Sequence, residues 1–177
     1  AIELGPDDLR LDAEEAGQLL GGAGVDLSEA ELAELTEHAE GWPAGLYLAA
    51  LSIRAQGRGA TGAAGFAGSD RLVADYLRSE LLAHLSPDDV RFLTRTSVLA
   101  RLSGPLCDAV LEASGSAAIL ESLERSNLFL VPLDRDRQWY RYHHLFQELL
   151  RAELEQDERD LVPELLDRAI EWHVANG

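Results

Sequence analysis

The sequence predicts a mainly α-helical chain, in which a small helical bundle is followed by a winged-helix domain with one β-hairpin wing. Two observations indicate the helices. Apolar residues recur at helical spacing through most of the chain, and helix-capping residues precede these segments. A third observation places the hairpin, because residues 128–142 change to a strand-like pattern that a polar turn interrupts.

Capping boxes predict the first two helices. Asp12 is followed three residues later by Glu15, so a helix is expected to run from there to residue 20, where a glycine-rich stretch ends it. Ser28 and Glu31 repeat the arrangement and predict a second helix that runs through Ala39.

The segment Gly41-Trp42-Pro43 interrupts the helical pattern, and Pro43 is well suited to be the first residue of a new helix. That helix, 44–55, is apolar nearly all round, so we expect it to be buried. Residues 56–68 are rich in glycine and alanine, which predicts a loop. A further helix with an apolar stripe is expected over 71–85.

Three serines predict the caps of the next three helices: Ser86, Ser103 and Ser116. Strand-like runs at 128–133 and 139–142 then flank the polar turn, and helices follow from His143 or His144 to about residue 155 and over 161–174. Three short helices, a hairpin and a closing helix are the order of a winged-helix domain. The predicted domains are a helical domain at 1–85, a winged-helix domain at 86–155 and, at 156–177, a helix that leads into further sequence.

Composition narrows the possible functions. The net charge is −17 and all 15 basic residues other than histidine are arginine. A Walker A loop requires a lysine, so this chain cannot contain one, and its charge opposes binding to nucleic-acid phosphates. The single cysteine, Cys107, favours a reducing cytoplasm, and no apolar run is long enough to predict a membrane span. We interpret the stretch from Ala1 to Gly177 as an interior piece of a longer protein.

Two segments carry a resemblance to a known family. The first includes Glu3-Leu4, Leu9-Arg10-Leu11 and Glu14-Glu15-Ala16, and ends in Gly41-Trp42-Pro43-Ala44-Gly45-Leu46. It resembles the helical domain of STAND signal-transduction ATPases, with their GxP motif at 41–43. The second, 139–146, is Trp-Tyr-Arg-Tyr-His-His-Leu-Phe and resembles the Met-His-Asp motif of their winged-helix domain. The amino-acid sequence of these segments most resembles that of the large MalT-like LuxR transcriptional regulators.

The resemblance implies a nucleotide switch in the full-length protein. ADP, or ATP with Mg²⁺, would be bound jointly with a separate nucleotide-binding domain, with Pro43 near the base and His143 at the β-phosphate. Inducer binding to downstream superhelical repeats would open this closed form, after which the protein self-associates and contacts DNA through a C-terminal LuxR helix-turn-helix. This chain has His144 at the position of the aspartate in the Met-His-Asp motif. The role of that aspartate in the family is therefore not assigned to His144. The chain itself would hold no cofactor.

Other interpretations remain open from the residues alone. The chain could be a DNA-binding winged helix or a nucleotide-independent protein-interaction module. Sequence-specific DNA binding is disfavoured by the third helix of the winged-helix domain, 116–126. This helix has one basic side chain, Arg125, and two acidic ones, Glu121 and Glu124, whereas a helix that contacts DNA bases normally presents basic and amide side chains. His144 and Glu148, four residues apart on a predicted helix, could share a metal ion, but no third ligand is evident. Cys107 is interpreted as an inert core residue. No arrangement of catalytic residue types predicts an enzyme.

Overall fold

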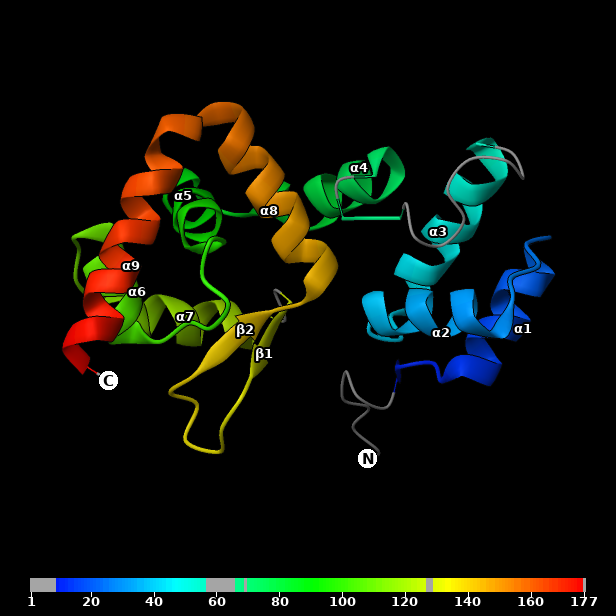
Figure 1. Ribbon diagram of the computed structural model, residues 1–177, viewed down its shortest axis with the longest axis horizontal. Helices are drawn as coiled ribbons and strands as arrows, with labels where there is room; N and C mark the ends of the chain where they lie inside the picture. Colours follow the sequence, from blue (N-terminus) through cyan, green and yellow to red (C-terminus); the bar gives the residue numbers. More distant parts are fainter. Residues whose placement is uncertain (1–8, 57–65, 69, 127–128, 177) are drawn as a thin grey trace. The chain divides into compact units, whose positions relative to one another are not determined.

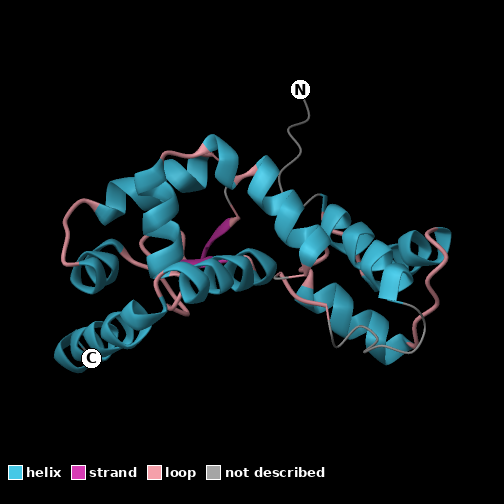
Figure 2. Ribbon diagram, turned by 90° about the horizontal axis from the view of Figure 1, so that it is seen from above, coloured by secondary structure: helices cyan, strands magenta, loops and turns pink. Residues whose placement is uncertain are grey.

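The computed structural model describes residues 9–56, 66–68, 70–126 and 129–176. It divides into two compact units, Ala1–Tyr76 and Leu77–Gly177, which are described here one at a time. Helices make up most of the described chain, and one short antiparallel hairpin supplies its sheet (Figure 2). The predicted fold class is therefore confirmed. The predicted domain ranges of 1–85, 86–155 and 156–177 stay predictions.

The first unit is built around the helix α1 (Ala13–Gly22), which packs on α2 (Glu29–His38) and α3 (Pro43–Gln56). Both predicted capping boxes are present: the Glu15 N–H donates to Asp12 Oδ1 at 2.9 Å and the Asp12 N–H to Glu15 Oε2 at 3.0 Å, and Ser28 with Glu31 repeats the exchange. The core of the unit consists of small and branched apolar side chains, among them Ala16, Leu20, Leu35, Leu46, Ala49 and Ala50.

Two expectations about this unit are corrected. The helix α3 is not buried all round, because Tyr47 is 49% exposed while Leu46, Ala49 and Ala50 are buried. The alanines of α3 allow close packing against α1 on one face, but they do not require the opposite face to be buried. Gln56, predicted as the first residue of the loop 56–68, still belongs to α3, and 57–65 lie outside the described residues. Phe66 is buried with its ring edge against His38, at 6.4 Å between ring centroids.

The helix α4 (Arg71–Glu80) crosses the division between the units. The helix predicted over 71–85 breaks after Glu80, and a short 3-10 turn, η3 (Leu82–His84), follows it. The second unit then contains α5 (Pro87–Thr96), α6 (Gly104–Leu111), α7 (Ser116–Arg125), β1 (Leu130–Pro132), β2 (Tyr140–Tyr142), α8 (His144–Asp157), η4 (Arg159–Leu161) and α9 (Val162–Asn176).

The helix α6 is the centre of the second unit, because it packs on α5, α7 and α9, while α8 covers α5 (Figure 1). Its residues Leu106, Cys107 and Val110 are fully buried. At its first residue, Gly104, an added Cβ would lie 2.7 Å from Cβ of Ala117, so glycine permits the close approach of α6 to α7.

The serine caps show a mixed outcome. Ser86 and Ser103 cap α5 and α6 as predicted, each accepting a backbone N–H three residues ahead. Ser116 was predicted to cap α7, and this is wrong: the cap is Gly115, at φ 92°, and Ser116 is the buried first residue of the helix. Its N–H donates to Asp108 Oδ1 at 2.9 Å, so a side chain from α6 satisfies this helix end.

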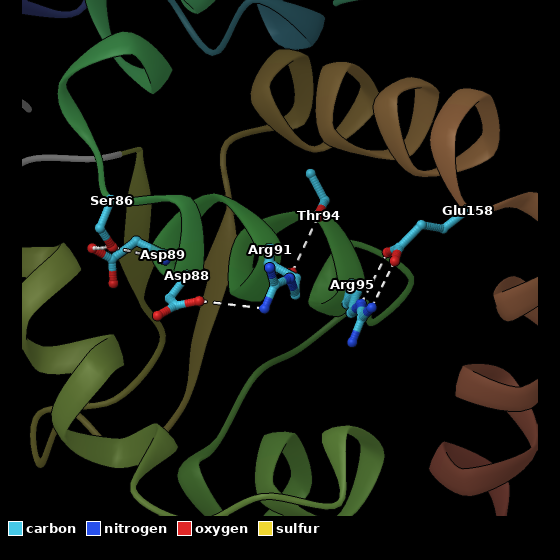
Figure 3. Close-up of polar contacts among 7 residues, drawn as sticks. All are labelled: Ser86, Asp88, Asp89, Arg91, Thr94, Arg95 and Glu158. Carbon is cyan, nitrogen blue, oxygen red and sulfur yellow. Dashed lines mark hydrogen bonds and ion pairs between the residues drawn. The ribbon is translucent and has the colours of Figure 1, made fainter.

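An ion pair joins the end of α5 to the end of α8. Arg95 donates from Nε to Glu158 Oε2 at 2.9 Å and from Nη2 to Oε1 at 2.6 Å, and Figure 3 shows the two side chains meeting in this fork. The same view shows the N-terminal cap of α5, where Ser86 and Asp89 are bonded. The bonded guanidinium lowers the pKa of Glu158, chiefly through these hydrogen bonds.

This pair predicts a pH-dependent contribution to stability. A lowered carboxyl pKa stabilises the fold above the ordinary value of 4.5, and that stabilisation is lost as the pH falls through the lowered pKa of the folded state. Glu158→Gln is therefore expected to cost up to about 1 kcal/mol at neutral pH, because both side chains are about a third exposed and screened. Urea titrations should show the cost shrink as the pH falls below 4.5, whereas the exposed control Glu155→Gln should cost little at any pH. A cost that stays the same from neutral pH to well below pH 4.5 would contradict the prediction.

Candidate functional site

The candidate site lies where the wing of the second unit meets α8. In the wing, β1 and β2 pair antiparallel with Leu130 opposite Tyr142 and Pro132 opposite Tyr140. Tyr140 also exchanges two backbone hydrogen bonds of 2.8 Å with Leu102, so the segment between α5 and α6 extends the hairpin by one bridge. The polypeptide passes from β2 directly into α8, and His143 is the residue between them.

His143 is the N-cap residue of α8. Its backbone is extended, its N–H donates to the carbonyl of Phe129 at 2.8 Å, and its own carbonyl accepts the N–H of Gln147 at 2.9 Å. The imidazole is only 6% exposed and packs edge-on against the ring of Phe129, with 5.2 Å between centroids. Of the two ring nitrogens, Nδ1 is buried. The neighbouring His144 is exposed.

The first turn of α8 is tied to the end of α5. Gln147 donates from Nε2 to the carbonyls of Ser97 and Leu99, both at 2.9 Å. The hydroxyl of Tyr142 lies 2.7 Å from Oγ1 of Thr96, and both side chains are buried. Burial raises the pKa of Tyr142, so the phenol is neutral. These contacts hold His143 in place, and sequence reasoning missed them because their partners are distant in the chain and no local pattern marks them.

Pro43 is the first residue of α3, as predicted, and is partly exposed. Gly41, two residues earlier, has φ 68°, a left-handed conformation that favours glycine. Its carbonyl accepts the N–H of Leu11 at 2.8 Å, and an added Cβ would lie 2.6 Å from the carbonyl oxygen of Leu11. The GxP motif thus has a structural explanation within the first unit. Pro43 and His143 belong to different units, and their nucleotide roles stay predictions.

The structure also places the residues on which the other interpretations depend. Arg125, the basic residue considered for DNA contact, is ion-paired with Glu121. Arg137 of the wing turn is likewise paired, with its Nε 3.4 Å from Glu124 Oε1, so neighbouring carboxylates compensate the charge of both arginines. Cys107 is fully buried, and burial raises its pKa to about 12, which leaves it a protonated core residue.

Within the described ranges, no group of three His, Cys, Asp or Glu side chains is arranged to hold a metal ion. None of the helices described here combines the length and the apolarity that crossing a membrane requires.

The helices, the hairpin and the extra bridge at Leu102 define the second unit as a winged-helix domain. A family model described as the MalT winged helix domain matches residues 72–162, and the chain belongs to this family. It is 35% identical over 176 residues to the serine/threonine-protein kinase PknK of Mycobacterium tuberculosis, a match that covers 99% of this chain and 16% of that protein.

Two further relatives are named HTH-type transcriptional regulator MalT. The chain is 32% identical to the one from Vibrio campbellii over 167 residues, covering 90% of this chain and 18% of that protein. It is 32% identical to the one from Yersinia enterocolitica over 181 residues, covering 99% of this chain and 20% of that protein. The chain therefore spans a fifth or less of the length of each of these relatives.

Proposed function

We propose that this chain is an interior regulatory region of a cytoplasmic, ATP-dependent LuxR-type transcriptional regulator, and that it couples nucleotide state to inducer sensing through contacts between domains of one polypeptide. The observation that carries the proposal is the position of His143. A histidine is held rigidly at the start of α8, in a chain of the MalT winged helix family, at the position where the resemblance implies a phosphate contact.

The names of the relatives support a coupling role rather than an output role. One relative is named a protein kinase and the others are named HTH-type transcriptional regulators, yet the same region is shared by all of them. A region shared by proteins with different named outputs is best explained as the part that controls an output. In this proposal a C-terminal helix-turn-helix of the full-length protein binds DNA. The region described here contacts the nucleotide-binding domain and the downstream repeats.

The residues present fit a peripheral contact with a nucleotide rather than a complete binding site. The first-turn N–H groups of α8 and its dipole favour an anion near His143, and Pro43 would contact the base from the first unit. The chain has no lysine for a phosphate-binding loop, so the phosphate cradle and the Mg²⁺ ligands belong to another domain. ADP or ATP with Mg²⁺ supplies the phosphate charge that these residues recognise.

The test replaces His143 in the full-length regulator. If His143 donates to the β-phosphate only in the closed state, His143→Ala removes a charge-assisted hydrogen bond of about 1.5–3 kcal/mol from that state. The closed-to-open equilibrium then shifts roughly ten- to hundredfold. We expect faster release of ADP and transcription at lower inducer concentration, measured as the ADP off-rate and as reporter output without inducer.

His144→Ala is the matched control, because His144 is the exposed neighbour and should change ADP release little. Since His143 is buried, His143→Gln, which keeps a side-chain donor, and a melting curve for each variant separate a lost contact from a lost fold. A folded His143→Ala variant that retains ADP as the wild type does, and stays silent without inducer, would falsify the phosphate role.

A further inference from the structure

Phe129 has an unusual backbone conformation beside the candidate site. Its φ is 52°, in the left-handed region that a bulky side chain rarely adopts. Among the residues that the structure describes, the other non-glycine residues with a positive φ are Glu40, Glu112 and Arg137. The two glutamates stand at the ends of helices and Arg137 in the turn of the wing, where left-handed residues are common. Phe129 directly precedes β1, so neither explanation applies to it.

The register of the hairpin explains what this conformation does. Leu130 of β1 lies opposite Tyr142 of β2, so Phe129 and His143 occupy the next position of the ladder. The His143 N–H donates to the Phe129 carbonyl at 2.8 Å, while the His143 carbonyl accepts the Gln147 N–H and begins α8. An extended backbone at Phe129 would continue the strand. The left-handed backbone instead ends the ladder at the residue where α8 starts.

The side chain of Phe129 links His143 to the core of the second unit. Between centroids, its ring lies 5.2 Å from the imidazole of His143 and 5.8 Å from the ring of Phe146. Phe146 is fully buried in α8 and also packs against Tyr142. Phe129 therefore holds His143 in two ways, through a backbone hydrogen bond and through an aromatic contact. Both contacts require the observed backbone conformation, because the carbonyl and the side chain of Phe129 project from the same α-carbon.

We propose that Phe129 is a positioning residue that acts as a latch on His143, in the sense that its left-handed backbone and its ring together keep the imidazole in place. Backbone strain persists only where surrounding contacts outweigh it, and it favours relaxation once those contacts weaken. Relaxation of Phe129 to an extended backbone would break the hydrogen bond to His143 and move the ring away from the imidazole. The use of this latch in nucleotide release rests on the proposed function, whereas the coupling between the two residues does not.

Two substitutions separate the backbone of Phe129 from its ring. Phe129→Asn and Phe129→Val both remove the ring, but asparagine adopts left-handed conformations readily whereas β-branched valine strongly disfavours them. Hydrogen exchange of the His143 N–H is measured by NMR in the 177-residue chain. It should be about tenfold faster in Phe129→Val than in Phe129→Asn, which is the effect of one disfavoured left-handed residue. Exchange of the buried amides of α6 should be the same in both variants.

Carbethoxylation with diethyl pyrocarbonate reports on the imidazole itself. His143 is 6% exposed and the adjacent His144 is exposed, so His144 serves as the reference within the same peptide. The ratio of His143 to His144 modification, measured by tandem mass spectrometry, should rise about tenfold in Phe129→Val if the latch releases the ring. It should stay at the wild-type value in Phe129→Tyr, which keeps an aromatic ring at this position.

Equal His143 exchange in Phe129→Asn and Phe129→Val, or an unchanged modification ratio in Phe129→Val, would overturn the latch. Melting curves show whether the second unit stays folded in each variant. If Phe129→Val is unfolded at the temperature of the measurement, Phe129→Ala replaces it in both comparisons, because alanine also disfavours the left-handed backbone but lacks the β-branch.

The full-length regulator separates the latch from the nucleotide role. Phe129→Val and His143→Ala should both speed the release of ADP. Faster release in His143→Ala, together with equal His143 exchange in the Asn and Val variants of Phe129, would overturn the latch and support the phosphate contact. The expected difference in exchange, together with wild-type ADP release in both full-length variants, would support the latch and overturn the phosphate contact.

Discussion

Replacing Gly41 with alanine is expected to unfold much of the first unit, at a cost of about 3 kcal/mol or more in the free energy of unfolding. Two effects add at this position. Alanine is strained at φ 68°, and its Cβ would lie 2.6 Å from the carbonyl oxygen of Leu11 and 3.3 Å from Cβ of Arg10. The obstacle is backbone, which cannot rotate away as a flexible side chain does. The Gly41→Ala substitution should also displace Pro43, because the turn at Gly41 leads directly into α3.

Gly24→Ala is the matched control for this prediction. Gly24 has φ 80°, but an added Cβ would meet nothing within 4 Å, so this variant carries only the backbone strain of about 1 kcal/mol. Hydrogen exchange measured by mass spectrometry should show protection lost over 13–56 in Gly41→Ala and largely kept in Gly24→Ala. Protection over 87–157, in the second unit, serves as the internal reference. Similar losses in the two glycine variants would show that the contact with Leu11 contributes little.

Gln147→Glu is the second substitution with a large expected effect, about 3 kcal/mol at neutral pH. The amide nitrogen that donates to the carbonyls of Ser97 and Leu99 becomes a carboxylate oxygen facing two acceptors. Both carbonyls lose their donor and a negative charge is added beside them. Because this bond ties the start of α8 to the end of α5, the variant should also loosen the backbone around His143.

The pH dependence of this variant has a definite sign. The unfavourable surroundings disfavour the ionised carboxyl in the folded state, so its pKa rises on folding and protonation restores one donor. The destabilisation, measured by urea titration, should therefore shrink as the pH falls. Gln156→Glu makes the same chemical change at an exposed position of α8 and should be nearly neutral throughout. A cost for Gln147→Glu that matches this control at neutral pH would contradict the assigned hydrogen bonds.

The local sequence determined much of the helix architecture. Asp12, Ser28, Ser86 and Ser103 were all predicted as caps and are caps in the structure. Each accepts a backbone N–H only three residues ahead, so a short stretch of chain contains the whole interaction. The prediction that Ser116 caps α7 was wrong for the opposite reason. Its helix end is satisfied by Asp108 from the preceding helix, and Gly115 supplies the left-handed turn, a combination that no local pattern reveals.

The functional region shows the same division between local and long-range information. The order of elements, the wing and the position of His143 at the start of α8 follow from residues that are adjacent in the sequence. The burial of that histidine under Phe129, the anchoring of Gln147 and the meeting of Trp139 with Trp172 do not. Capping and periodicity act over one or two helical turns, whereas these contacts join segments that only chain folding brings together. Tertiary packing alone decided which side chains from distant segments meet.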